Sequence, residues 1–306
     1  MNGSSRLKGR ALALLLLLAA VFAAHGRALR GKFLNFDDDR IVTANPLFHA
    51  PLGRALEGIL DPTRTIADAY LPVTHLSLYL DWRLFGGSPW GMHLSSLLWH
   101  FLAAAALLAL GFRMGLTRKG ALLAALLFAL HPALVEDTAW ISSRKYLLAG
   151  LFSFLTLSLW ISALEGRKKA AWGALLTALL AVYSNGAALV LLPFAGLLSL
   201  FPPRRQGREE KSPFPWAPLA LLALVVLGAG IHHAWLASRA GTAALGGGED
   251  RTLSMVPSVF SWYLEKALLP LGLSVDYPYP VYLKKLLSGG FLPWVLSGGA
   301  LSLIHI

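Results

Sequence analysis

The sequence predicts an all-α protein that crosses a membrane several times. Apolar residue types make up 56% of the 306 residues and charged types only 14%, whereas ordinary soluble domains are about half apolar and about a quarter charged. The mean hydropathy is +0.59. The apolar residues form long runs instead of alternating with polar ones, so they cannot build a water-facing surface. Intrinsic disorder is thereby excluded. Because cysteine is absent, so are disulfides and thiolate chemistry.

The apolar runs predict seven or eight transmembrane helices. A spanning helix needs about 20 apolar residues, and the candidate spans are residues 11–29, 93–112, 120–134, 146–164, 170–183, 187–201 and 216–236, with an eighth that begins near residue 291. The first run also has the basic start and small-residue end of a secretory signal. Cleavage of such a signal is therefore an alternative, and it would leave the remaining topology unchanged.

The basic residues predict the orientation of these spans. Lys and Arg cluster before the first span and after the second, fourth and sixth, namely at Arg6, Lys8, Arg10, Arg113, Arg118, Lys119, Arg167, Lys168, Lys169, Arg204, Arg205, Arg208 and Lys211. Alternation of the spans puts all four clusters on one face, which the positive-inside rule makes cytoplasmic. The amino terminus is then cytoplasmic, and the net charge of +11 needs no nucleic-acid partner.

Two long segments, residues 30–91 and 237–290, fall on the outer side. The first contains Trp82, Phe85 and Trp90, which suits helices lying at the membrane interface. We interpret both segments as ordered caps over a cavity. In the second, Tyr277 opens a Tyr-Pro-Tyr-Pro stretch that is either a rigid wall for a peptide or lipid head group, or a loop that prolines keep extended.

Asp37, Asp38 and Asp39 form the densest acidic cluster, directly after the first span. A carboxylate at the outer membrane surface can take a proton from a hydroxyl nucleophile or bind a divalent metal ion. The alternative is a solvated acidic turn.

A second polar block follows the third span. His131 and Pro132 end that span, and Glu136, Trp140 and Arg144 recur at four-residue steps, which in one helix places them near one face. Arg144 and Lys145 are outer-side cations, which the topology rule disfavours, so they are candidates for binding a phosphate. An interfacial salt bridge from Glu136 to Arg144 is equally compatible with the pattern.

The histidines give no metal signature. His93 and His100 are seven residues apart on one predicted helix face, and His75 and Asp81 precede them, but no compact ligand spacing is present. We therefore favour a structural role for these histidines, while residues 37–39 could hold a divalent ion.

These pieces, in this order, resemble a known family. The stretch FLNFDDDRIVTANP (33–46) and the blocks 70–100, 126–149 and 263–280 are similar to the polytopic GT-C glycosyltransferases of the protein O-mannosyltransferase kind. They most resemble the bacterial relatives of the transmembrane and tetratricopeptide-repeat (TMTC-type) proteins. The fold this implies is a GT-C-type helical bundle over residues 1–300, in a bacterial inner membrane.

The resemblance implies transfer of a sugar, mannose or another hexose, from a polyprenyl-phosphate carrier to a hydroxyl acceptor on a protein or glycan at the outer membrane face. The catalytic base then lies at Asp38, with Asp37 and Asp39 as alternatives. The resemblance assigns binding of the donor phosphate to His131, Arg144 and Lys145, and it implies that no metal is required. The supporting residues are Glu136, Trp140, His93 and Tyr277.

Two departures from the family pattern bear on activity. Relatives carry an acidic residue after the Arg-Lys pair, where this chain has Tyr146, and a lysine at the outer end of the fifth span, where it has Asn185. Relatives also continue into tetratricopeptide repeats. We expect a fragment here, because residues 301–306 match the in-frame translation of a common sequencing adapter and are interpreted as an artefactual tail.

Two other function classes fit a multi-pass protein. A degenerate relative could be a non-catalytic membrane anchor for a repeat domain. A transporter or lipid-carrier translocator would place ionisable residues at mid-membrane and use inverted repeats, which this sequence lacks.

Overall fold

The computed structural model describes residues 3–203, 216–239, 263–270 and 273. The chain divides into two compact units, residues 1–243 and 244–306, and the second is described only at a helix over residues 263–268 and the few residues after it. Tyr277, the span expected from residue 291, the tail 301–306 and the basic cluster at 204–211 lie outside the described residues. The described residues contain no β-strand, and most of them are helical.

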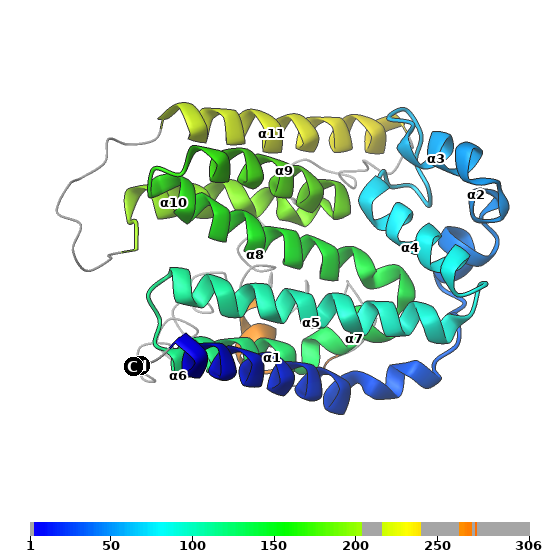
Figure 1. Ribbon diagram of the computed structural model, residues 1–306. Coiled ribbons are helices and arrows are strands. Elements are labelled where there is room, and N and C mark those ends of the chain that lie inside the picture. Colours follow the sequence, from blue (N-terminus) through cyan, green and yellow to red (C-terminus); the bar gives the residue numbers. More distant parts are fainter. Residues whose placement is uncertain (1–2, 204–215, 240–262, 271–272, 274–306) are drawn as a thin grey trace, which may run out of the picture. The chain divides into compact units, whose positions relative to one another are not determined.

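A bundle of antiparallel helices forms the first unit (Figure 1). Its members are α1 Gly3–His25, α5 Pro89–Arg113, α6 Arg118–Ala129, α8 Arg144–Leu164, α9 Lys168–Ser184, α10 Leu191–Leu200 and α11 Trp216–Arg239. Short connections between α5 and α6, α8 and α9, and α9 and α10 force neighbouring helices to run in opposite directions. An all-α polytopic membrane protein is confirmed.

Fewer of the described helices are long and apolar enough to cross a membrane than the seven or eight predicted from the sequence. Four described segments are long and apolar enough to cross a membrane, Lys8–Arg30, Pro89–Arg113, Ile141–Leu164 and Trp216–Arg239. A fifth is possible as a bent pair, Arg118–Ala129 with Pro132–Ala139, whose axes differ by 49°. Helix α9 has 17 residues, and the apolar helix Gly186–Leu200 is also short.

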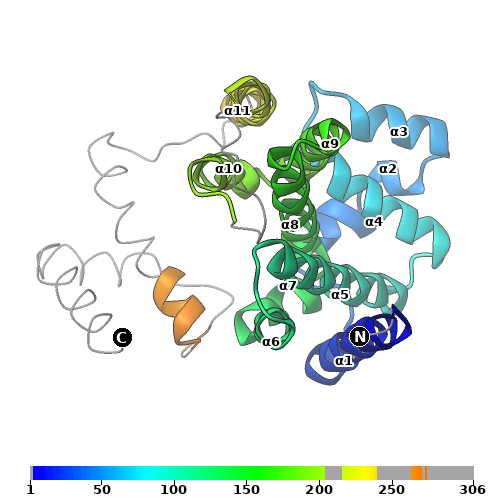
Figure 2. The same cartoon turned by 60° about the vertical axis from the view of Figure 1, so that its left-hand side comes forward.

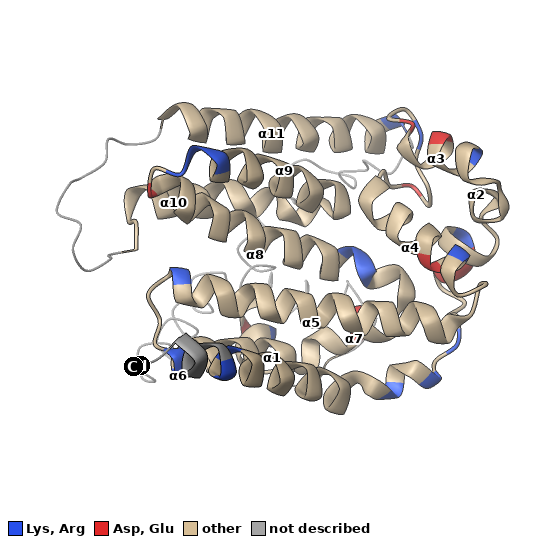
Figure 3. Cartoon of the chain, viewed as in Figure 1, with Lys and Arg blue, Asp and Glu red and all other residues tan. Residues whose placement is uncertain are grey.

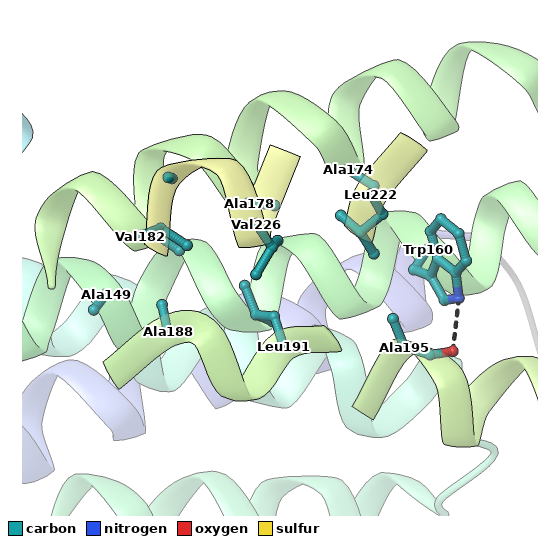
Figure 4. Packing of buried hydrophobic residues seen from close by; sticks show 12 residues of the cluster. Ala149, Trp160, Ala174, Ala178, Val182, Ala188, Leu191, Ala195, Leu222 and Val226 are labelled. Atoms are coloured by element: carbon teal, nitrogen blue, oxygen red, sulfur yellow. Dashed lines mark hydrogen bonds between the residues drawn. The ribbon is translucent and has the colours of Figure 1, made fainter. Parts of the chain in front are cut away.

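Two apolar clusters hold the bundle together on either side of α8 (Figure 2). On one side α1, α5 and α6 pack through fully buried side chains that include Leu17, Val21 and Leu97. On the other, α9, α10 and α11 pack against α8 through Ala174, Ala178, Leu222 and Val226, among others, around the buried Trp160 (Figure 4). Alanine at successive turns of α9 lets these helices approach closely, as small residues do in membrane bundles.

The first outward segment folds into short helices, as predicted. They are η1 Gly26–Arg30, η2 Asp39–Thr43, α2 Pro46–His49, α3 Leu52–Leu60 and α4 Pro72–Leu84. A third apolar cluster, with Phe48, Ile59 and Leu78 fully or almost fully buried, packs these helices on the start of α5 and on Ile141. The segment is therefore an ordered cap.

Acidic residues of the first unit gather toward one end of the bundle, whereas basic residues lie at both ends (Figure 3). The start of α1, the end of α5 and the starts of α6 and α9 carry the described basic clusters, and the antiparallel order brings them to one end. Except for Glu165, the acidic residues of the described first unit lie toward the opposite end, with the first outward segment and the α6–α8 connection.

The block from residue 132 to residue 144 is not one helix, so the expected common face for Glu136, Trp140 and Arg144 is wrong. Helix α7 (Val135–Ala139) ends at Trp140, whose φ of −106° and ψ of 116° are extended, and the one-turn helix η4 (Ile141–Ser143) precedes α8. The break has a local cause. The backbone N–H of Ser142 donates to the Asp38 side chain at 2.9 Å instead of to a carbonyl one turn earlier, which a continuous helix would require.

Candidate functional site

Asp38 is the most enclosed of the three adjacent carboxylates. Its side chain is fully buried. One carboxylate oxygen accepts hydrogen bonds from the Ser142 backbone N–H at 2.9 Å and the Ser142 hydroxyl at 2.5 Å, and the other accepts from the Leu34 backbone N–H at 2.9 Å. The carboxylate thus joins the first outward segment to the η4 turn, 104 residues away in sequence.

Its neighbours are more open. Asp37 and Asp39 are both half-buried. Asp39 accepts a hydrogen bond from the Arg40 backbone N–H at 2.8 Å, and Arg40 in turn forms a 2.9 Å ion pair with Asp68. Within the described part of the chain, the Asp37 carboxylate makes no hydrogen bond or ion pair. Asp37 is therefore the carboxylate of this cluster that is left open to a substrate.

Arg144 is fully buried and its guanidinium is occupied by the protein. It forms an ion pair with Asp81 of α4 and donates to the Met92 carbonyl at 2.6 Å. Longer bonds reach the Ser96 hydroxyl at 3.3 Å and the Ser77 carbonyl at 3.4 Å. The bridge to Glu136 that the sequence allowed is not formed. Arg144 instead fixes the start of α8 against α4 and α5, because its fork of donors matches several acceptors at once.

The side chain of Lys145 lies in a different environment from that of Arg144. Its side chain is half-buried, with the ammonium 5.8 Å from the ring centre of Trp140 and 5.5 Å from that of Tyr146. Phe36, which precedes the acidic cluster in the sequence, packs edge-on against the Trp140 ring, with 5.3 Å between the ring centres. Trp140 therefore bridges the acid-bearing segment and the lysine. Among the described residues, no acidic side chain forms an ion pair with Lys145.

Titratable groups around Lys145 have shifted pKa values. We place α7 outside the spans, because it carries two adjacent acids. Burial raises the pKa of Asp137 to about 7, with help from Glu136 and against the opposing effect of Lys145. Burial also raises the pKa of Glu136. In α4, burial and Lys145 lower the pKa of His75 to about 4, so this imidazole is neutral at physiological pH.

Two buried polar side chains near Lys145 have unused hydrogen-bonding atoms in the described part of the chain. They are the Trp140 indole N–H and the Ser143 hydroxyl. The His93 ring, in contrast, lies within reach of the Lys32 and Thr138 backbone. His93 packs directly under Gly31, where an added Cβ would approach its Nε2 to 2.8 Å. Buried polar atoms are normally paired. Unused ones beside Asp38 and Lys145 mark where a polar ligand could bind.

The remaining predicted residues have local roles. His131 accepts a hydrogen bond from the Ala133 backbone N–H at 3.2 Å and so caps the short helix η3 (Pro132–Leu134). His100 lies deeper, where it and His25 both donate to the Ala129 carbonyl, at 3.1 and 2.9 Å. This shared carbonyl ties α1 and α5 to the end of α6.

Both departures from the family pattern are visible in the structure. Tyr146 is an exposed ring beside the Lys145 ammonium, where relatives carry an acid. Asn185 caps the helix η5 (Gly186–Val190) by accepting from the Ala187 backbone N–H at 2.8 Å. Over the described ranges, no three His, Asp or Glu side chains are grouped to hold a metal ion. A divalent ion at residues 37–39 stays a prediction.

Sequence reasoning missed Ser142 and Asp137 and gave Asp81 no partner. Ser142 is one of many serines, and only its contact with Asp38 singles it out. Asp137 was detectable as half of an acidic pair placed just before Trp140. The pairing of Asp81 with Arg144 joins residues 63 positions apart, which no local pattern encodes.

Fold and site together define a polytopic helical membrane protein that places a carboxylate cluster beside a lysine at one end of its bundle. Comparison with known proteins specifies the class further. Residues 71–231, more than half of the chain, match the dolichyl-phosphate-mannose-protein mannosyltransferase family, and the chain belongs to that family. The matched stretch contains Arg144 and Lys145 but begins after residues 37–39.

Three curated relatives support the assignment. The chain is 29% identical over 185 residues to protein O-mannosyl-transferase TMTC4 of Homo sapiens, covering 54% of this chain and 25% of that protein. It is 28% identical over 191 residues to protein O-mannosyl-transferase F38B6.6 of Caenorhabditis elegans, covering 60% and 27%. It is 32% identical over 150 residues to protein O-mannosyl-transferase TMTC1 of Mus musculus, covering 46% and 16%. The chain thus spans about a quarter or less of these relatives' length. No solved structure matches it.

Proposed function

We propose that this chain carries the catalytic site of a membrane glycosyltransferase. The enzyme transfers mannose or another hexose from a polyprenyl-phosphate carrier to a protein Ser or Thr hydroxyl at the outer membrane face. The observation that carries the proposal is the contact between Asp38 and Ser142. It brings an acidic segment and the Trp140–Lys145 pair to the same end of the bundle.

In this proposal Asp37 is the base. The sequence favoured Asp38, but that carboxylate already accepts three hydrogen bonds in a fully buried position, so we assign it to positioning. Asp37 takes the proton of the acceptor hydroxyl, whose oxygen bonds to C1 of the sugar while the bond from C1 to the phosphate oxygen breaks. The electron pair of that bond leaves with the polyprenyl phosphate.

Lys145 binds the departing phosphate. Its ammonium has no acidic partner among the described residues and lies over two aromatic rings, which leaves its charge available for an anion. Arg144, committed to Asp81, holds the start of α8 in place so that the neighbouring lysine is presented. The Trp140 indole N–H is a further donor for a sugar or phosphate oxygen.

The site's position at a bundle end suits an amphiphilic donor. The polyprenyl tail must stay in the bilayer while the phosphate and sugar meet water, so the chemistry belongs where both are accessible. The positive-inside rule makes the opposite, basic end cytoplasmic, which supports an outer site. No metal is invoked, because one lysine and one carboxylate supply the charge and the base.

Sugar transfer and donor binding, measured separately in proteoliposomes, test the proposal. The full-length protein is compared with Asp37→Asn, Asp38→Asn, Asp39→Asn and Lys145→Gln. Asp37→Asn should lower transfer by about 10²–10⁴-fold while donor binding persists, and Lys145→Gln should weaken both. Asp39→Asn is the matched control and should retain transfer within about tenfold.

Other outcomes would overturn the proposal. Unchanged transfer in all three Asp variants removes the acidic base. A wild-type protein that binds no polyprenyl-phosphate sugar is a non-catalytic membrane anchor, a function for which Tyr146 and Asn185 would then be the explanation. Substrate uptake by proteoliposomes that contain no sugar donor identifies a transporter.

A further inference from the structure

A cavity of about 400 Å³ lies at the end of α8 remote from the candidate site. It is bounded by the last turn of α8, the first turns of α9 and the start of α11. Apolar side chains, among them Trp160, Leu164, Leu175 and Leu221, line most of it. The space exists because several lining positions carry small residues, at Ala163, Gly166, Ala171 and Ala217. Its volume is in the range of small-molecule and lipid sites.

The Trp160 wall is rigid. The indole N–H donates to the Ala195 carbonyl at 3.1 Å and lies 3.0 Å from the Ser199 hydroxyl (Figure 4). This anchoring to α10 holds the ring in one orientation, so the ring cannot rotate to fill the space. The cavity is therefore a stable feature of the packing between α8, α9 and α11.

A cation stands at this cavity without an acidic partner. Lys168 is the one charged residue that lines it, and within the described chain its ammonium forms no hydrogen bond or ion pair. Glu165, the nearest acid in sequence, is already paired with Arg113 at 3.4 Å and with Arg167 at 3.5 Å. The local positive charge is thus only partly compensated.

The position of Lys168 in its helix adds to this uncompensated positive charge. Helix α9 begins Lys168, Lys169, with no acidic residue in its first turn and no side chain capping its first N–H groups. Helix amino termini favour anions and disfavour cations. An external negative group would offset both the helix dipole and the lysine charges.

One of the side chains that line the cavity is an exposed aromatic residue. Trp172, which lines the cavity, is 68% exposed although it sits in a helix of a membrane bundle. A tryptophan one turn inside a cluster of cations is typical of the boundary between acyl chains and head groups. An acyl chain and a phosphate are therefore both within reach of the same cavity.

We propose that the cavity binds an anionic glycerophospholipid, with one acyl chain between Trp160 and Leu221 and the phosphate on Lys168. Basic pockets between transmembrane helices are known binding sites for anionic lipid head groups. The proposed sugar-transfer site is separate, because residues 146–159 of α8 lie between Lys145 and Trp160, a rise of about 22 Å at 1.5 Å per residue. The lipid would stabilise the α8–α9–α11 packing.

Photo-crosslinking of the full chain in bilayer nanodiscs tests this inference. Phosphatidylglycerol with a photoreactive acyl chain should label peptides over residues 160–175 and 217–221, and unlabelled phosphatidylglycerol, but not phosphatidylcholine, should compete. Lys168→Gln should lower this labelling about fivefold, as expected for one lysine beside an anionic lipid. Lys169→Gln, which changes a lysine outside the cavity lining, is the matched control and should change labelling less than twofold.

A second variant guards against misfolding as an explanation. Ala171→Phe fills the cavity and leaves both lysines in place, so it should abolish labelling of these peptides while the protein still elutes as the wild type does in size-exclusion chromatography. Equal labelling by the phosphatidylcholine analogue, or unchanged labelling in both Lys168→Gln and Ala171→Phe, overturns the inference. Displacement by polyprenyl phosphate in preference to phosphatidylglycerol also overturns it.

Discussion

The two ends of α8 use basic residues in opposite ways. At the first end, Arg144 is fully buried and its guanidinium is bound by Asp81, Ser77, Met92 and Ser96. At the other end, Lys168 follows the turn after α8 and has no partner among the described residues, while Glu165 is shared between two arginines. The helix therefore joins an internally satisfied polar network to an end with excess positive charge.

This difference separates structural cations from cations available to ligands. A guanidinium offers five donors in a fixed plane and suits a buried site with several acceptors. A lysine ammonium is a compact charge on a flexible stem, and both Lys145 and Lys168 stand where an anion could approach. Of the adjacent Arg144 and Lys145, only the lysine is available for substrate.

Breaking the Arg144 network should have the largest effect on stability. Asp81→Ala leaves a buried guanidinium without its counter-ion, and removal of one partner from a buried pair costs about 3–5 kcal/mol. We expect the free energy of unfolding in detergent, measured by denaturant titration, to fall by that amount.

The double variant Arg144→Met with Asp81→Leu provides the matched test, because replacing both charges by apolar groups removes the unpaired ion. It should regain most of the lost stability. Equal losses in the single and double variants would contradict the structural role given to this pair.

The pH dependence of stability should come next in size. Because burial raises the pKa of Asp137 to about 7, the folded state keeps this proton at pH values where the unfolded carboxyl has lost it. The contribution of Asp137 to stability should therefore fall as pH rises from about 4 to about 7, and level off above that range. His75, whose pKa is lowered to about 4, contributes stability that rises over part of the same range. Glu136 acts in the same direction and Lys145 in the opposite one.

We expect the Asp137 contribution to decrease by about 2–4 kcal/mol over this range, the lower value allowing for the partial exposure of Asp137. Unfolding of the wild type and of Asp137→Asn at pH 4, 5.5 and 7 gives this contribution as the difference between their slopes. Asp137→Asn should have a more positive slope than the wild type, whereas Asp39→Asn should leave the slope unchanged. An unaltered slope in Asp137→Asn would assign the titration to another group.

The sequence predicted the architecture well because membrane helices are encoded locally. Apolar runs gave the helices, and the first outward segment was correctly expected to be helical and ordered. The resemblance gave the family. Neither the apolar runs nor the resemblance could predict which residue of a short motif has which role. Asp38 differs from Asp37 through its burial and its contacts with Ser142 and Leu34, and Arg144 differs from Lys145 through contacts with α4 and α5.

The broken helix after residue 132 shows the same limit. Four-residue spacing predicted one continuous face, yet a side chain 104 positions away takes the N–H of Ser142, and Trp140 becomes extended. Helical periodicity describes what a segment can form alone. A buried carboxylate that needs donors overrides it, because an unpaired charge in that position costs more than one helical turn gains.

A smaller effect should follow from loss of the Ser142 hydroxyl. Ser142→Ala removes one of the three hydrogen bonds to Asp38 and keeps the one from the backbone. Hydrogen bonds to charged groups contribute about 1.5–3 kcal/mol, and we expect unfolding to become easier by an amount in that range. Ser143→Ala is the control, because its hydroxyl has no partner in the described chain, and it should change stability by less than about 0.5 kcal/mol.

The smallest change in stability should be the most informative about the site. Trp140→Phe keeps an aromatic ring between Phe36 and Lys145 but removes the indole N–H, which is buried and makes no hydrogen bond within the described residues. In either case the smaller ring should cost about 1 kcal/mol of packing. If the N–H serves only packing, sugar transfer should stay unchanged. If it binds a substrate oxygen, as we propose, the KM for the polyprenyl-phosphate sugar should rise about five- to tenfold, the equivalent of one hydrogen bond. Measuring stability and KM on the same preparation separates a ligand-binding N–H from a merely unsatisfied one, because only the former changes KM.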